Sequence, residues 1–326
     1  MSYEYIEIGD PDFLENHIQN EELDYILVRK RSLENVPIDH WKPPAYCFTR
    51  RFKNFESELT NFEVKHDDVW VASYPKSGTT WCQEMVWLIC NGLNYDAAKT
   101  QHLRKRFPFL DISLIHDLPD GRSSFQKVES MTSPRFIKTH LPVSMLPKQY
   151  WDVLPKTVYV HRNVKSVAVS YYHHSKNYFY RGTKEQFVRS FMKDLQFYSP
   201  IHSHVIGYHS LKGCENILHL RYEDMKFDLK KVAEKVCSFF GHYYSNTQLE
   251  GLCQHLSFGS MKNNVSCNYE DETDATWIDK EPDDRFIRRG QVDSWKSELT
   301  SELNRDLDEW TKTSVKDKKH LSLFFE

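Results

Sequence analysis

The sequence predicts a single α/β domain with a central, mainly parallel β-sheet flanked by helices. The chain has 326 residues, 40% of them hydrophobic, which suits one large domain better than a small one. Short β-branched runs alternate with helical patterns, an order typical of parallel strands joined by crossover helices. Basic residues follow several of these runs, at the edge where such sheets bind ligands.

Four short runs are expected to form the buried strands of this sheet. Each is rich in apolar or β-branched residues and is bounded by a helical pattern or a turn. The runs are residues 69–73 (VWVAS), 135–139 (RFIKT), 157–161 (TVYVH) and 216–222 (NILHLRY).

The expected helices carry apolar residues at helical spacing. Two of them close on a glycine, Gly92 or Gly241, which is typical of a helix C-terminus. An acidic stretch without periodicity, residues 266–290, is expected to be a solvated loop. The helices are expected at residues 79–92, 164–176, 228–241 and 300–317, the last as a charged surface helix.

Composition excludes several classes of protein. The 43 Lys and Arg against 46 Asp and Glu give a net charge of −3, so no global bias toward nucleic acid exists. The seven cysteines form no C-x-x-C pair, which argues against a disulfide framework or zinc site and fits a reducing compartment. The N-terminus lacks a signal-peptide pattern, and no run approaches the ~20 apolar residues of a membrane span. We expect a cytoplasmic protein without a metal, nucleic acid or membrane partner.

The segment SYPKSGTTW, residues 73–81, is interpreted as an anion-binding turn between a strand and a helix. It fails the Walker A pattern because Ser73 and Thr79 replace the first glycine and the lysine, which disfavours an ATP site or a nucleotide kinase. Gly78 still allows close backbone approach at a helix N-terminus, whose N–H groups favour anions. The alternative is an ordinary turn with a solvated lysine. The donors for a phosphate-like group are Lys76, Ser77, Thr79 and Thr80.

Six further motifs follow in order: PFLD (108–111), SPRFIKTHLP (133–142), YVHRNVKSVAVSYYHH (159–174), RYEDMK (221–226), LSFGSMKNN (256–264) and FIRRG with WK (286–296). With the turn, they resemble the cytosolic sulfotransferase family, which moves a sulfuryl group from 3′-phosphoadenosine-5′-phosphosulfate (PAPS) to a hydroxyl or amine. The resemblance implies a P-loop-like sulfotransferase domain over residues 45–326. Residues 1–44 are expected to pack on it and border the acceptor pocket.

The resemblance assigns catalytic roles to four side chains. His140 is implied as the general base, since an imidazole with a pKa near neutrality can take a proton from a hydroxyl. Lys76 is implied at the leaving group and Lys138 near the transferring sulfuryl group, where cations stabilise developing charge. Ser170 is implied to restrain Lys76. A lone histidine or lysine would more often be structural or solvated. For His140, its place just after a predicted strand and two residues from Lys138 favours a site, and for the two lysines their motifs do.

The resemblance also implies a complete cofactor site without a metal. The 5′-phosphosulfate would bind Lys76, Ser77, Gly78, Thr79 and Thr80. The 3′-phosphate requires a second basic pocket, because arginine grips phosphate oxygens in pairs. This pocket would consist of Arg162, Ser170, Arg288, Arg289 and Gly290. Aromatic faces can stack on adenine, although each could equally be a core residue. The implied faces are Trp81, Tyr222 and Phe258.

On the acceptor side the resemblance implies Phe109, Lys138, His140 and His174. His174 replaces a phenylalanine common among phenol-acting members, so it is either a second proton acceptor or a surface histidine. Leu256 replaces an adenine-contacting threonine. A homodimer stays open, but the usual dimer segment is altered here to Lys296, Thr300, Ser301 and Arg305. The long acidic loop before the arginines resembles insect members.

The sequence therefore predicts sulfuryl transfer to a small apolar acceptor, such as a phenol, steroid or retinoid alcohol, in small-molecule metabolism or detoxification. Two alternatives remain. One is a dehydratase in which sulfation of an allylic alcohol such as retinol is followed by elimination of sulfate. The other is a non-catalytic carrier of hydrophobic ligands. No motif indicates which acceptor is used.

Overall fold

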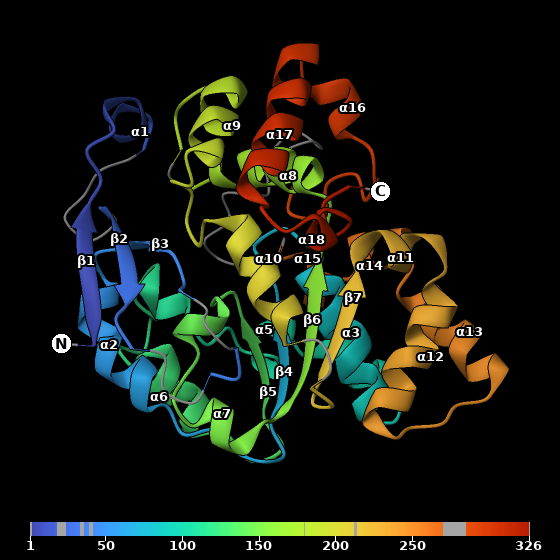
Figure 1. Cartoon of the computed structure of the whole chain (residues 1–326). Helices are drawn as coiled ribbons and strands as arrows, with labels where there is room; N and C mark the ends of the chain where they lie inside the picture. Colours follow the sequence, from blue (N-terminus) through green and yellow to red (C-terminus); the bar gives the residue numbers. More distant parts are fainter. Residues whose placement is uncertain are drawn as a thin grey trace.

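A four-stranded parallel sheet forms the centre of the molecule (Figure 1). The computed structural model describes residues 2–17, 24–32, 36–38, 42–178, 180–211, 214–269 and 285–325. The sheet has the order β5-β4-β6-β7, and all its neighbouring strands are parallel. Its strands are β4 (Val69–Ala72), β5 (Phe136–Thr139), β6 (Lys156–His161) and β7 (Ile217–Arg221). The predicted sheet is confirmed, and every strand end lies within one residue of its expected position.

The central strands are buried on both faces. Along β4, Trp70 and Ala72 pack into one hydrophobic cluster, whereas Val69 and Val71 pack into another. Successive side chains of a strand point to opposite faces, so this division places a core on each side of the sheet. Continuous apolar runs are typical of such doubly covered strands.

The four predicted helices are confirmed as α3 (Thr79–Cys90), α8 (Val164–Ser175), α12 (Leu229–Phe240) and α17 (Ser301–Ser314). Helix α3 ends two residues before Gly92, which adopts a left-handed φ of 63° beyond the cap. Gly241 caps α12 with a φ of 77°. At its other end, the side chain of Asp228 accepts a hydrogen bond from the Lys231 N–H.

Shorter helices surround these elements. They are α1 (Pro11–Asn16), α2 (Phe52–Asn61), α4 (Tyr95–Thr100), α5 (Leu103–Arg106), α6 (Ser124–Glu129), α7 (Tyr150–Val153), α9 (Lys184–Met192), α10 (Ile201–Ser210), α11 (Tyr222–Phe227), α13 (Asn246–His255), α14 (Phe258–Asn263), α15 (Val265–Asn268), α16 (Trp295–Glu298) and α18 (Lys318–Leu321). Two 3-10 helices cover Ile112–Leu114 and Val143–Met145. Among the described residues, no helix is long and apolar enough to cross a membrane.

The prediction of a loop over residues 266–290 is wrong at its start, because residues 266–268 belong to α15. The Asn264 side chain caps this helix by accepting from the Ser266 N–H at 3.1 Å, and the Ser266 hydroxyl donates to the Lys99 carbonyl at 2.6 Å. One local cap and one long-range hydrogen bond thus stabilise a turn of helix that apolar periodicity does not reveal. Residues 270–284, which carry most of the acidic run, lie outside the described residues.

A second sheet, at the left of Figure 1, was not predicted. Its strands are β1 (Tyr3–Glu7), β2 (Tyr25–Lys30) and β3 (Tyr46–Thr49), paired antiparallel in that order. Residues 1–44 contribute the first two strands, and β3 lies beyond them. The buried faces of all three strands join the cluster that covers one side of the parallel sheet.

Candidate active site

The turn after β4 is shaped by backbone that only special residues adopt easily. Gly78 caps α3 with a φ of 101°, and Lys76 has a left-handed φ of 66°. A Cβ at Gly78 would lie 2.6 Å from Cδ2 of Tyr222, so the aromatic ring rests directly on the loop. The Ser73 and Thr79 hydroxyls form a 2.7 Å hydrogen bond across the base of the turn. The turn is therefore rigid, with the first N–H groups of α3 beside it.

Lys76 lies in a concentration of positive charge. Burial lowers the pKa of its amine to about 7, and the charges of Lys138, Arg162 and Arg288 lower it further in the same direction. Its Nζ also lies 4.5 Å from the ring centroid of Phe286. A lysine pKa falls this way where water is excluded and other cations approach. The site thus gathers cations from four separate segments of the chain.

His140 follows β5 directly and is buried. Its Nδ1 donates to the Ser73 carbonyl oxygen at 2.7 Å, a contact that requires the proton on Nδ1 and leaves the lone pair on Nε2. Burial, and to a smaller extent the charge of Lys138, holds the pKa of His140 well below its ordinary value. The imidazole is therefore neutral at neutral pH, with Nε2 able to accept a proton.

The backbone of His140 is fixed from two sides. Its N–H donates to the carboxylate of Asp111 at 3.3 Å, and its carbonyl accepts from Nε2 of His204 at 2.9 Å. The same carboxylate accepts from the hydroxyls of Thr139, at 2.7 Å, and Tyr198. Burial raises the pKa of Asp111 to about 6, although these hydrogen bonds act to lower it.

Sequence reasoning missed the three residues Asp111, Tyr198 and His204 that hold the histidine. Only Asp111 gave a signal, as the polar residue that ends the apolar PFLD motif. The other two lie on the segment around α10, far along the chain from β5.

Phe109 and Lys138 flank His140. A parallel β-bridge joins these two residues, through hydrogen bonds of the Lys138 backbone to Pro108 and Leu110, both at 2.9 Å. The Lys138 Nζ lies 4.0 Å from the Phe109 ring centroid, and that ring lies 5.1 Å from the His140 ring. Burial lowers the pKa of Lys138 to about 8 despite the opposing charge of Asp111. A cation, a base and an apolar ring thus share one surface.

Arg162, at the end of β6, connects the turn to the C-terminal part of the chain. It donates to the Lys76 carbonyl at 3.4 Å and to the Gln291 carbonyl at 2.9 Å. Its guanidinium lies 4.2 Å from the ring centroid of Tyr222. Its buried Nε has no hydrogen-bond partner in the part of the chain that the structure describes.

Ser170 and His174 project from α8 toward the same place as Lys76 and Arg288. All four line a small cavity of about 10 Å³ together with Phe286. The remaining lining residues are His173, Asn177 and Arg285. Arg288 and Arg289 both bind Glu298, at 2.5 and 3.5 Å, and Arg289 is the more exposed of the two.

The predicted adenine residues form an aromatic group beside this cavity. The rings of Trp81 and Tyr222 lie edge to face at 5.7 Å, and the Trp81 indole N–H donates to the Leu256 carbonyl at 2.8 Å. Gly290, with a φ of 59°, packs on Phe258 so closely that a Cβ would lie 2.3 Å from its ring. An open hollow of about 680 Å³ adjoins this group, lined by Lys226 and residues 290–294, 296 and 297.

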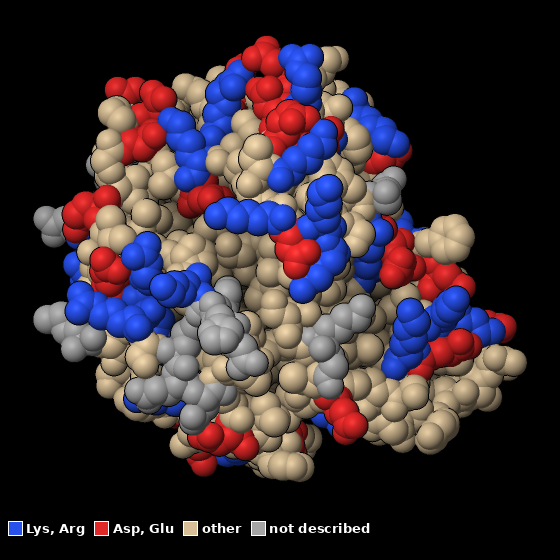
Figure 2. All heavy atoms as spheres, viewed as in Figure 1, with Lys and Arg blue, Asp and Glu red and all other residues tan. Residues whose placement is uncertain are grey.

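The positive charge of the site is confined to the site and does not extend over the surface shown in Figure 2. On the face shown in Figure 2, basic and acidic side chains are interspersed, in agreement with the net charge of −3. Within the described ranges, no group of three or more His, Cys, Asp and Glu side chains is placed to hold a metal ion. All seven cysteines are free thiols.

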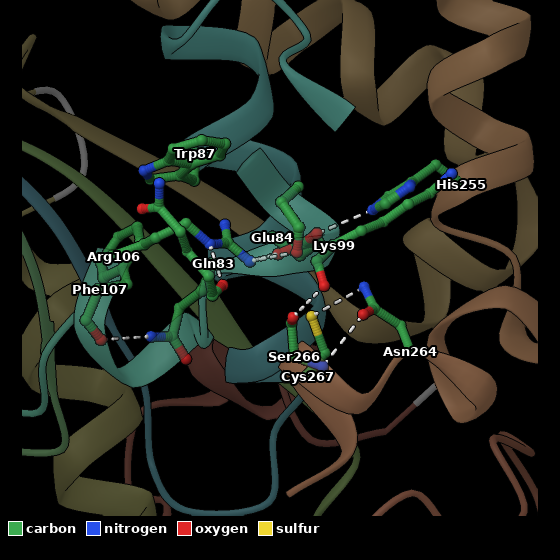
Figure 3. A network of polar contacts seen from close by, with 12 residues as sticks. Gln83, Glu84, Trp87, Lys99, Arg106, Phe107, His255, Asn264, Ser266 and Cys267 are labelled. Carbon is green, nitrogen blue, oxygen red and sulfur yellow. Dashed lines mark hydrogen bonds and ion pairs between the residues drawn. The ribbon is translucent and has the colours of Figure 1, made fainter. Parts of the chain in front are cut away.

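A buried network anchors the helix that begins at the turn (Figure 3). Glu84 of α3 accepts from Nη2 of Arg106 and from Nε2 of His255, both at 2.8 Å. The Arg106 guanidinium lies 4.4 Å from the Trp87 ring, and the Gln83 amide donates to the Phe107 carbonyl at 3.2 Å. Because the chain continues from α5 into the PFLD motif, the network fixes Phe109 and its neighbours relative to α3.

The fold is that of an α/β protein with a glycine turn, a helix N-terminus and a group of cations at the carboxyl ends of parallel strands, where such sheets bind ligands. Comparison with known proteins is more specific. The sulfotransferase domain model matches residues 66–319. The chain is 37% identical to luciferin sulfotransferase of Photinus pyralis over 81% of this chain and 76% of that protein. A sulfotransferase 1 family member of Rattus norvegicus is 36% identical over 75% of this chain and 82% of its own length.

The chain belongs to the sulfotransferase family and is a sulfotransferase enzyme, as the sequence motifs predicted. Solved structures agree with this assignment. A retinol dehydratase in complex with androsterone and inactive cofactor PAP is 28% identical, with a TM-score of 0.85 over 97% of both chains. The same enzyme with retinol and PAP is 29% identical, with a TM-score of 0.85 over 97% of this chain and 98% of the other.

Proposed function

We propose that this chain transfers a sulfuryl group from PAPS to a hydroxyl or amine of a small apolar acceptor such as a phenol, steroid or retinoid alcohol. The observation that carries the proposal is the concentration of cations around Lys76, whose pKa falls to about 7 through burial and through Lys138, Arg162 and Arg288. Cations so crowded are stabilised when a ligand with several negative charges lies among them.

The residues present fit PAPS. Aromatic rings lie against the backbone at Gly78 and Gly290, and in this proposal the adenine would lie among Trp81, Tyr222 and Phe258. The unpartnered Nε of Arg162 is a donor available to a phosphate. The turn residues Lys76, Ser77, Gly78, Thr79 and Thr80 would hold the 5′ end, and Arg162, Ser170, Arg288, Arg289 and Gly290 the 3′-phosphate. When bound, PAPS supplies the sulfuryl group and a bisphosphate leaving group.

In this proposal His140 acts as the general base. Its Nε2 takes the proton of the acceptor hydroxyl, because Nδ1–H is committed to the Ser73 carbonyl. Lys138 stabilises charge at the transferring group, and Lys76 stabilises it on the leaving oxygen. Ser170, which shares the small cavity with Lys76, restrains that amine.

The acceptor would lie against apolar side chains. Phe109 packs on His140, and Tyr198 lies on another side of the imidazole with its ring centroid 5.6 Å away. His174 lies near the turn cavity. Residues 1–44 border this side in our proposal, supported by the β-bridge between His17 and Tyr180, just beyond α8. The free thiols support a cytoplasmic location.

The test is transfer of labelled sulfate from PAPS to a panel of phenols, catecholamines, steroid alcohols and retinol. A product with any member that disappears in His140→Ala, while binding of adenosine 3′,5′-bisphosphate persists, supports the proposal. Equal transfer by the variant would exclude His140 as the base. Binding of the nucleotide without transfer to any acceptor would instead favour the carrier alternative.

A second candidate reaction is dehydration of an allylic alcohol, favoured by the TM-score of 0.85 to retinol dehydratase over 97% of this chain. The hydroxyl would first become a sulfate ester. The C–O bond would then break with loss of sulfate and a proton, so the net change is loss of water. Mass spectrometry of the products from retinol separates the two reactions, since one yields a sulfate ester and the other a dehydrated hydrocarbon.

A further inference from the structure

Glu298, the last residue of α16, binds basic side chains from three other segments. Its carboxylate is 2.6 Å from Nε2 of His173 in α8 and 2.9 Å from Nζ of Lys184 in α9. It also lies 2.5 Å from Nη1 of Arg288 and 3.5 Å from Nη1 of Arg289. The side chain of Glu298 is only 8% exposed. One buried carboxylate is therefore the common partner of four basic groups.

The positive charges of this group exceed the negative charge. Lys184, Arg288 and Arg289 carry three positive charges against the single charge of Glu298. Burial alone would raise the pKa of Glu298, but hydrogen bonds from His173, Lys184 and Arg288 hold it well below its usual value. Without the carboxylate these cations would repel one another. Arg288 also lines the small cavity beside Lys76, so an anion placed there would meet two cations.

The arginines stand on irregular backbone. Residues 285–294 contain no helix or strand. Hydrogen bonds from Arg162 to the Gln291 carbonyl at 2.9 Å and from Ser166 to the Val292 carbonyl at 2.6 Å hold part of this segment. Both hold the backbone after Gly290 and neither orients an arginine side chain. Glu298 does so from a position fixed by α8 and α9.

We infer that Glu298 is a positioning residue that orients Arg288 and Arg289 and thereby sets the preference for nucleotides with a 3′-phosphate. The inference rests on the proposed use of PAPS. The carboxylate is tied to His173 and Lys184 as well as to the arginines, so it stays in place when a ligand arrives. Arg288 has five N–H donors, and the bond to Glu298 leaves others for a phosphate.

The test compares the Kd of adenosine 3′,5′-bisphosphate with that of adenosine 5′-monophosphate by titration calorimetry. The wild type is expected to prefer the bisphosphate. Glu298→Gln keeps the shape but removes the charge, and should reduce the ratio of the two affinities about tenfold, within the range for a lost charged hydrogen bond. Binding of the monophosphate should change little. Glu298→Asp, which restores the charge, should recover part of the preference.

The matched control is Glu302→Gln, which removes a carboxylate of α17 that pairs with Arg189 at 3.2 Å on the exposed surface. It should leave the ratio unchanged. Both affinities are measured on one preparation, so a fraction of unfolded protein cancels from the ratio. An unchanged or enhanced preference in Glu298→Gln overturns the inference alone. Equal affinity of the wild type for both nucleotides would overturn the proposed 3′-phosphate site as well.

Discussion

The two ends of the candidate site are built differently. At one end, Lys138 lies on the strand β5 and His140 follows it directly, and hydrogen bonds from the core hold the histidine at its backbone and ring. At the other end, Arg288 and Arg289 stand on irregular backbone and share one carboxylate. The histidine is thus oriented by the backbone and core around a strand end, whereas the arginines are oriented by a shared side chain. The predictions below test this division.

The largest effect is expected at the strand end, from Asp111→Asn. The amide removes a charged acceptor of the His140 N–H and the Thr139 and Tyr198 hydroxyls. Charged hydrogen bonds of ~1.5–3 kcal/mol correspond to a fall in kcat of roughly 10- to 100-fold. The KM for PAPS should change little. Steady-state kinetics measures both, with Asp117→Asn as the control, an exposed carboxylate that pairs with Arg51. A change in KM alone would contradict the assigned role.

A smaller effect is expected in the turn, from Gly78→Ala. The new Cβ meets the Tyr222 ring at 2.6 Å, and the φ of 101° is strained for alanine. Such strain costs about 1–3 kcal/mol, so nucleotide affinity should fall about tenfold as the turn or the ring shifts. Gly251→Ala in helix α13 is the control, because its Cβ would lie at an ordinary contact distance of 3.5 Å from the Tyr95 hydroxyl. Equal nucleotide affinity of Gly78→Ala and Gly251→Ala would contradict the prediction and show that the Tyr222 ring can move aside.

The smallest effect is a pH dependence of nucleotide binding. The pKa values of Lys76 and Lys138 are lowered to about 7 and about 8, so both amines lose protons as pH rises through that range. An anion favours the protonated amines, and binding should therefore take up protons and weaken severalfold between about pH 7 and 9. Calorimetry in buffers of different ionisation enthalpy measures the uptake. The proton uptake should decrease in Lys76→Met. It should persist in Arg288→Gln, because arginine stays charged over this whole pH range.

The parallel sheet could be predicted because its strands are short runs rich in apolar or β-branched residues, and the four predicted helices carry apolar residues at helical spacing. The N-terminal sheet could not. Its strands β1 and β2 are short, and their pairing depends on partners distant in the sequence rather than on a local pattern. Helix α15 escaped prediction because side-chain hydrogen bonds at Asn264 and Ser266 stabilise it without apolar periodicity.

Motifs likewise located the charged residues of the site but not the residues that orient them. Lys76 and His140 each follow a recognisable strand, and Lys138 lies near the end of one. No sequence pattern indicates His204 or Glu298, because a single histidine or glutamate can equally be an ordinary surface residue. Their roles come from tertiary contacts with His140 and Arg288, and a single sequence does not record tertiary distance.

The buried network of Figure 3 bears on the order in which the chain assembles. Glu84 contacts His255, 171 residues further along, and Trp81 contacts Leu256 at a separation of 175. Contacts that close such long loops form late in folding, since the entropy of closure must be overcome first. During synthesis from the N-terminus, the turn and its helix emerge long before these partners exist. The turn and helix α3 therefore gain these contacts only after most of the polypeptide has been synthesised.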